Sequence, residues 1–227
     1  MSIKLIVFDM AGTTVKDDND VTVAFQTAIA AYGYPVAAEV INPLMGYEKK
    51  TAIRKMLDTY EADKSKITTE LVDNIHHKFV ELMISHYQHT PKLIALPHAE
   101  DTMATLRSKG IKIGINTGFS RVIADTIINR LQWREKALFD YLIGSDEVPE
   151  GRPDPTMIFS MMKQAGITDA QEVAKVGDTE VDVREGHNAG CRYVIGVTTG
   201  TFSRAALEPY NPTHIVDDIA EVLQIVS

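Results

Sequence analysis

Five short apolar runs recur along the chain, and each ends at a polar or glycine-rich corner. Such runs are typical of strands that are buried on both faces of a sheet. They occupy residues 3–8, 111–115, 141–143, 173–176 and 193–197. Most of the segments between them carry apolar residues at helical spacing, as in 99–109 and 120–131. The alternation predicts an α/β fold with a mostly parallel sheet between two layers of helices.

Residues 21–89 break this alternation. Helical periodicity runs through 21–32, 51–60 and 69–86, and no convincing strand lies among them. A helical insert after the first strand is the simplest interpretation, and it would lie over the carboxyl end of that strand. We therefore expect a core domain formed by residues 1–15 and 95–227 and a helical cap domain formed by residues 16–94.

Composition limits the classes of function. The chain has 227 residues, is 44% hydrophobic and carries a formal net charge of -8, which disfavours binding to nucleic acid or anionic membranes. No apolar run approaches the roughly 20 residues of a membrane helix, and the first residues do not form a secretory signal. The single cysteine, Cys191, leaves no intrachain disulfide and no zinc cluster. We expect a soluble cytoplasmic protein, a monomer or homodimer, that binds a small anion at a local positive site.

Acidic residues follow two of the predicted strands. Asp9 comes directly after the first strand, and Gly12 lets backbone amides turn toward an anion there. Asp178 follows the fourth strand, and Asp182 lies about one helical turn further on. Two carboxylates this close favour a hard cation such as Mg²⁺. Taken alone, each motif also fits a plain turn at Asp9, or a helix cap at Asp178 followed by a solvated Asp182.

Two further motifs offer contacts to a phosphoryl group. Asn116-Thr117-Gly118 ends the second strand, where a hydroxyl and backbone amides can receive an anion at a helix start. Arg152 precedes Pro153 and offers a permanently charged fork. The alternatives are an ordinary helix cap at Thr117 and a surface turn at Arg152.

In this order, the four motifs resemble those of the haloacid dehalogenase superfamily, on both sides of the helical insert. The resemblance implies a Rossmann-like core with an inserted helical cap. It also implies an aspartate nucleophile at Asp9, phosphoryl contacts from Thr117, and Mg²⁺ held by Asp9, the Ala11 carbonyl and Asp178, with Asp182 close by. The residues expected to bind the substrate around them are Gly12, Met45, Gly46, Asn116 and Gly118.

Two departures from the usual superfamily pattern narrow the resemblance. Most phosphatases of the superfamily carry a general-acid aspartate two residues after the nucleophile, where this chain has Ala11, and a lysine where it has Arg152. Both features look like the phosphonoacetaldehyde hydrolases, or phosphonatases. Ala11 cannot protonate a leaving alkoxide, so the sequence favours a substrate whose carbon accepts the electrons of a broken carbon-phosphorus bond through an iminium.

Lys49 is the candidate amine for that iminium. It follows Met45 and Gly46 at the place where the phosphonatases have their Schiff-base lysine. If Lys49 begins a helix, its stem lies on apolar surface, and the charges of Lys50 and Arg54 lower its pKa. The alternative is an ordinary solvent-exposed lysine.

The match to the phosphonatases departs at three positions. Ala52 stands where that family has a histidine implicated in proton transfer, and Phe119 stands where it has a tyrosine. Asp154 replaces an aromatic residue. The phosphonatases proper are also longer than this chain.

The leading hypothesis is a Mg²⁺-dependent hydrolase that cleaves phosphonoacetaldehyde or a related carbonyl phosphonate. Its expected catalytic residues are Asp9, Lys49, Thr117 and Arg152. The alternative is a phosphatase for a small phosphorylated metabolite, similar to phosphoglycolate phosphatase. A third possibility is a non-catalytic phosphate-binding module. The presence of Asp9 counts against it, because binding phosphate does not require an attacking carboxylate.

Overall fold

A computed structural model describes residues 2–226. Its centre is a six-stranded, wholly parallel sheet in the order β3-β2-β1-β4-β5-β6. The strands are β1 (Leu5–Phe8), β2 (Lys112–Thr117), β3 (Tyr141–Gly144), β4 (Val173–Gly177), β5 (Tyr193–Val197) and β6 (His214–Val216). The five predicted strands are confirmed. Strand β6 was not predicted, because a three-residue edge strand with an exposed first residue carries too little pattern.

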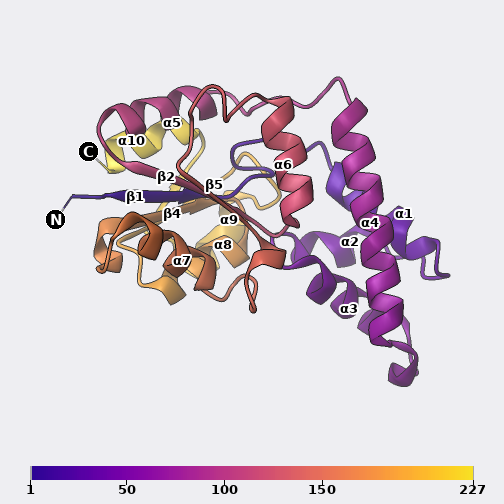
Figure 1. The fold of residues 1–227 in the computed structure, drawn as a ribbon. Helices are drawn as coiled ribbons and strands as arrows, with labels where there is room; N and C mark the ends of the chain where they lie inside the picture. Colours follow the sequence, from indigo (N-terminus) through magenta and orange to yellow (C-terminus); the bar gives the residue numbers. More distant parts are fainter. Residues whose placement is uncertain (1, 227) are drawn as a thin grey trace.

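Helices cover both faces of the sheet (Figure 1). Those outside the insert are α5 (Ala99–Ser108), α6 (Arg121–Arg130), α7 (Thr156–Ala165), α8 (Glu180–Ala189), α9 (Arg204–Leu207) and α10 (Val222–Ile225). Successive side chains of β1 point to opposite faces. Ile6 and Phe8 therefore pack on the side of α5 and α6, whereas Leu5 and Val7 pack on the side of α7 and α8. The predicted α/β class is confirmed.

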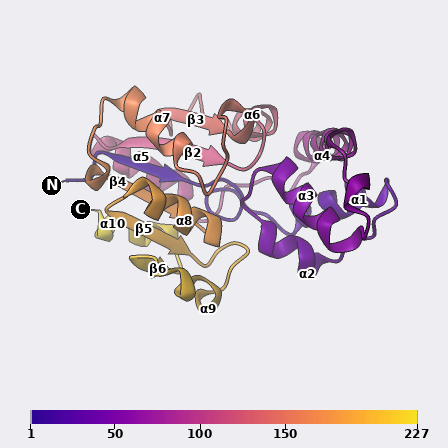
Figure 2. The same ribbon diagram turned by 90° about the horizontal axis from the view of Figure 1, so that it is seen from below.

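The segment after β1 is helical, as the periodicity predicts. It contains α1 (Asp20–Ala30), α2 (Ala38–Ile41), α3 (Lys49–Tyr60) and α4 (Thr69–His89). These helices lie together beyond one end of the sheet, and both chain termini lie at the other end (Figure 2). Phe25 of α1 stacks on Phe79 of α4 with ring centroids 4.3 Å apart. No helix within residues 2–226 has the length and hydrophobicity that a bilayer-spanning helix needs.

The loop before α3 presses against the core. A side-chain carbon at Gly118 would come within 2.5 Å of the Tyr47 carbonyl oxygen, so only glycine allows this approach. Gly46 has a φ of +85°, and a side-chain carbon there would come within 2.6 Å of Thr179 Oγ1. The Tyr47 hydroxyl donates a hydrogen bond to Glu180 Oε1 over 3.1 Å. These contacts bring the start of α3 to the carboxyl ends of the strands.

Candidate active site

Three carboxylates meet where β1 and β4 end. Asp9 follows β1, Asp178 follows β4, and Asp182 lies in the first turn of α8. One oxygen from each lies within 4.8 Å of the other two, and all three side chains are buried. Neighbouring parallel strands end at the same edge of the sheet, which is why residues so distant in sequence converge. The N-cap of α8 is Thr179, so Asp178 is free of the capping role that the sequence left open.

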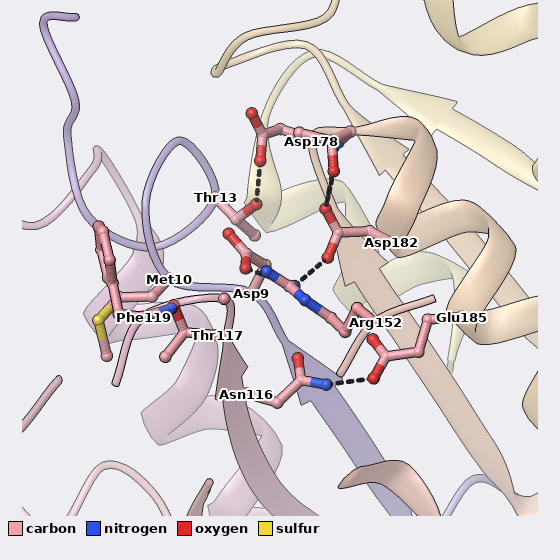
Figure 3. Close-up of polar contacts among 12 residues, drawn as sticks. Asp9, Met10, Thr13, Asn116, Thr117, Phe119, Arg152, Asp178, Asp182 and Glu185 are labelled. Carbon is pink, nitrogen blue, oxygen red and sulfur yellow. Dashed lines mark hydrogen bonds and ion pairs between the residues drawn. The ribbon is translucent and has the colours of Figure 1, made fainter. Parts of the chain in front are cut away.

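Arg152 joins two of these carboxylates. Its Nη1 donates hydrogen bonds to Asp9 Oδ1 and Asp182 Oδ1, each over 2.6 Å, and Figure 3 shows the guanidinium between the two acids. Burial lowers the pKa of Arg152, but Asp182 and Asp9 outweigh burial and hold it above its usual value. With 3% of its surface exposed, Arg152 is not the surface arginine of the alternative interpretation.

Asp178 has no cationic partner among the described residues. It accepts hydrogen bonds from Thr13 Oγ1 over 3.2 Å and from the Thr201 amide over 2.7 Å. Burial raises the pKa of Asp178 well above its usual range, and the charges of Asp9 and Asp182 raise it further. A hard divalent cation would offset this crowding of negative charge. The three acids, together with Ala11 in the wall of the adjacent cavity, therefore fit a Mg²⁺ site.

A buried polar layer lies beneath the three acids. Lys175 Nζ lies 3.0 Å from Asp182 Oδ1 and 3.1 Å from Glu185 Oε2, and it donates to Asn116 Oδ1 over 2.6 Å. Asn116 Nδ2 in turn donates to Glu185 Oε1 over 2.7 Å. Burial raises the pKa of Asp182, but Lys175 and Arg152 hold it below its ordinary value. The layer thus keeps Asp182 ionised and fixes its direction.

Sequence reasoning missed Lys175 and Glu185. The available signals were a lysine in the middle of an otherwise apolar strand and a glutamate three residues after Asp182, on the same helix face. Both side chains are fully buried.

A cavity of about 30 Å³ lies against the carboxylates, with room for only a water molecule or two. Its wall is formed by Asp9, Ala11, Asp17, Val21, Met45, Gly46, Lys49, Thr117, Gly118, Phe119, Arg152, Asp178, Thr179 and Thr201. Most of the expected site residues are thus brought together. Thr117 lies in this wall, and its hydroxyl accepts a hydrogen bond from the Phe119 amide over 3.1 Å.

Two residues expected to bind the substrate lie outside the cavity wall. Asn116 turns its amide to Glu185 and Lys175, so both ends of that side chain are occupied. Gly12 packs against Asp178, where a side-chain carbon would come within 2.6 Å of Oδ2. Its φ of +86° also favours glycine. Asn116 and Gly12 therefore support the residues of the site and do not line its cavity.

Lys49 is the first residue of α3, in the helical segment, and it forms part of the cavity wall. The Glu48 side chain caps the helix by accepting hydrogen bonds from two amides of its first turn. Lys49 has only 4% of its surface exposed, and its Nζ lies 4.9 Å and 5.5 Å from the ring centroids of Phe119 and Phe25. No carboxylate of residues 2–226 lies within ion-pair distance of that nitrogen. The solvent-exposed alternative is therefore wrong.

Burial lowers the pKa of Lys49 to about 8, and the positive charge of Arg152 acts in the same direction. The predicted direction is correct, but the predicted cause is wrong. Lys50 points away and pairs with Asp73 over 2.8 Å, and Arg54 donates to the Ile67 carbonyl over 3.2 Å. The amine is less basic because apolar rings replace water around it.

Comparison with known proteins identifies the family and the relatives of the chain. The haloacid dehalogenase-like hydrolase family matches residues 6–196. A protein of Bacteroides fragilis named phosphonoacetaldehyde hydrolase is 31% identical over 98% of this chain and 88% of its own length. One of Bacillus cereus with the same name is 28% identical over 98% and 87%.

Solved structures share the fold. A phosphonoacetaldehyde hydrolase like protein from Oleispira antarctica superposes with a TM-score of 0.85 at 20% identity, covering 100% of this chain and 92% of its own. A predicted phosphoglycolate phosphatase from Haemophilus somnus superposes with a TM-score of 0.80 at 20% identity, covering 99% and 98%.

Proposed function

Because the chain belongs to the haloacid dehalogenase-like hydrolases, we propose that it is a Mg²⁺-dependent phosphonatase, which cleaves the carbon-phosphorus bond of phosphonoacetaldehyde or a related carbonyl phosphonate. The observation that carries this proposal is the Lys49 amine. It lies in the wall of the same small cavity as Asp9, buried and without a carboxylate partner among residues 2–226. A neutral amine can condense with an aldehyde, a step that hydrolysis of a simple phosphate ester does not include.

Asp9 is the proposed nucleophile toward phosphorus. Arg152 fixes one of its oxygens, and the same guanidinium offers charge to the phosphoryl oxygens together with Thr117 and the Gly118 backbone. Asp9, the Ala11 carbonyl and Asp178 would hold Mg²⁺, which when bound neutralises phosphoryl charge so that two anions can approach.

Lys49 supplies the electron sink. Its neutral amine condenses with the substrate aldehyde to an iminium. When Asp9 attacks phosphorus, the electron pair of the carbon-phosphorus bond moves into the iminium and leaves an enamine on Lys49. Protonation and hydrolysis of that enamine release acetaldehyde, and water hydrolyses the phosphoaspartate. Departure of carbon in this way needs no acid at position 11, where the chain has alanine.

Two further observations support the proposal. Relatives named phosphonoacetaldehyde hydrolase align over nearly the whole chain. The cavity of about 30 Å³ is small, and we expect the helical segment 16–94, the predicted cap domain, to open for substrate entry and to close to exclude water. We also propose that the protein binds a small phosphonate or phosphate, is located in the cytoplasm, and is a monomer or homodimer.

Borohydride trapping tests the imine. Wild-type protein, Mg²⁺ and phosphonoacetaldehyde are mixed, reduced and digested, and we expect the mass adduct on the peptide that contains Lys49. The variant Lys49→Arg should give no adduct and no turnover. Lys50→Arg is the matched control, because Lys50 is exposed and paired with Asp73. An unmodified Lys49 in a protein that turns the substrate over would exclude the imine step.

The second candidate is a phosphatase for a small phosphorylated metabolite. It is favoured by the shared fold with the predicted phosphoglycolate phosphatase from Haemophilus somnus. Hydrolysis of a phosphate monoester that survives Lys49→Ala would select this candidate.

A further inference from the structure

The proposed reaction moves protons that none of the assigned residues can carry. Imine formation needs a group that takes a proton from the attacking amine and gives one to the departing hydroxyl. Ala11 and Ala52 have no titratable group. The ionisable side chains in the cavity wall are Asp9, Asp17, Lys49, Arg152 and Asp178. Four of these have roles as nucleophile, amine, phosphoryl contact and metal ligand, so Asp17 is the one left.

One carboxylate oxygen of Asp17 accepts hydrogen bonds, and the other has no partner among the described residues. Asp17 lies in the linker between β1 and α1. Its Oδ1 accepts hydrogen bonds from the Asp20 amide over 2.9 Å and the Val21 amide over 3.4 Å, which anchors the carboxylate at the start of α1. Its Oδ2 makes no hydrogen bond or ion pair with any residue in the described range 2–226. Asp17 and Lys49 both lie in the cavity wall, and the charge of each acts on the pKa of the other.

We propose that Asp17 is the catalytic proton carrier for imine formation and imine hydrolysis at Lys49. The inference rests on the phosphonatase function proposed above. The reaction begins with a proton on Asp17 and with Lys49 neutral. As the Lys49 nitrogen bonds to the aldehyde carbon, Asp17 gives that proton to the carbonyl oxygen, which becomes a hydroxyl, and the Asp17 carboxylate then takes a proton from the nitrogen. Asp17 then returns its proton to that hydroxyl, the carbon-oxygen bond breaks, and water leaves an iminium beside the Asp17 carboxylate. After carbon-phosphorus cleavage and protonation of the enamine, the same carboxylate takes a proton from the water that attacks the iminium.

The surroundings suit a shared proton. Burial raises the pKa of Asp17, its two amide hydrogen bonds and the charge of Lys49 oppose that rise, and Asp20 adds to it. Charged groups also shift the pKa of Lys49. The charge of Arg152 lowers it, and the charges of Asp9, Glu48 and Asp17 raise it. The hydroxyl of Tyr87 on α4 is buried with no hydrogen-bond partner in residues 2–226, and burial and the charge of Asp17 both raise its pKa. The raised pKa of Asp17 and the lowered pKa of Lys49 bring the two groups closer in proton affinity, as exchange of a proton between them requires.

The pH profile distinguishes this role from a structural one. In wild type, kcat/KM for phosphonoacetaldehyde should be bell-shaped, since activity needs the singly protonated pair, and its upper limb should fall near pH 8. Asp17→Asn keeps the oxygen that caps α1 but cannot carry the proton. We expect kcat/KM and the rate of borohydride trapping to drop by about 10²- to 10⁴-fold. The remaining activity should rise through a single transition near pH 8.

Asp18→Asn is the matched control, because Asp18 is exposed, pairs with Lys16 over 2.8 Å and lies outside the cavity wall. It should behave as wild type. Asp17→Asn with wild-type rates, or with slower rates and an unchanged bell-shaped profile, would overturn the inference while leaving the phosphonatase function intact. Wild type that neither turns over phosphonoacetaldehyde nor traps at Lys49 would overturn both. If Asp17→Asn fails to fold, the pH dependence of wild-type trapping decides, and a profile without an upper limb overturns the inference.

Discussion

Replacing Lys49 by methionine should stabilise the protein. The Lys49 side chain is 4% exposed, lies against the rings of Phe119 and Phe25, and forms no ion pair with a carboxylate of residues 2–226. Folding therefore removes a charge from water without replacing its partners. Methionine fills a similar volume with an uncharged, adaptable chain that suits aromatic neighbours.

The magnitude follows from the pKa, which burial lowers from 10.5 to about 8. At about 1.4 kcal/mol per pKa unit, the charged amine costs the folded state about 3 kcal/mol. Below pH 8 the folded and unfolded chains both carry the proton, so the whole cost is present. Between pH 8 and 10.5 the unfolded chain binds more protons than the folded one, so wild-type stability rises with pH. Above pH 10.5 the cost is gone.

Urea unfolding of wild type and Lys49→Met at pH 7 and pH 10.5 measures this difference. We expect Lys49→Met to be about 3 kcal/mol more stable at pH 7 and within about 1 kcal/mol of wild type at pH 10.5. Lys50→Met is the control, because its exposed pair with Asp73 contributes about 1 kcal/mol or less. The reasoning is refuted if Lys49→Met is no more stable than wild type at pH 7, or if its advantage is the same at both pH values.

Three other outcomes are expected. Asp9→Asn should abolish phosphate release while the circular dichroism spectrum and unfolding midpoint stay close to wild type; residual turnover above about 1% would exclude Asp9 as the nucleophile. Lys175→Met should lower the unfolding free energy in urea by about 3–5 kcal/mol, because it leaves Asp182 and Glu185 buried with fewer partners; a loss below about 1 kcal/mol would contradict the described ion pairs. Chelation with EDTA should stop turnover and added Mg²⁺ should restore it; activity that persists in EDTA would exclude the metal at Asp9 and Asp178.

Much of the fold was readable from the sequence, because parallel strands buried on both faces leave continuous apolar runs. The turns after β1 and β4 are enough to predict from the sequence that Asp9 and Asp178 lie at the same edge of the sheet. The edge strand β6 could not be predicted, since its three residues are neither wholly buried nor regularly alternating.

The environment of Lys49 could not be predicted from the sequence in the same way. Its low pKa depends on Phe25 of α1 and on Phe119 between β2 and α6, which only tertiary packing brings to the amine. The same holds for Asp17, which looks like one acid in an ordinary polar linker until the cavity wall is known. Lys175 and Glu185 compensate each other in the interior, and a pattern of single residues does not show such a pair.

The most direct test of carbon-phosphorus cleavage is to measure both products of phosphonoacetaldehyde with Mg²⁺ in the same reaction, for wild type and Lys49→Arg. The account predicts one acetaldehyde for each phosphate from wild type and neither product from the variant. Wild type that releases no acetaldehyde, but hydrolyses phosphate monoesters at a rate that Lys49→Arg leaves unchanged, would contradict it.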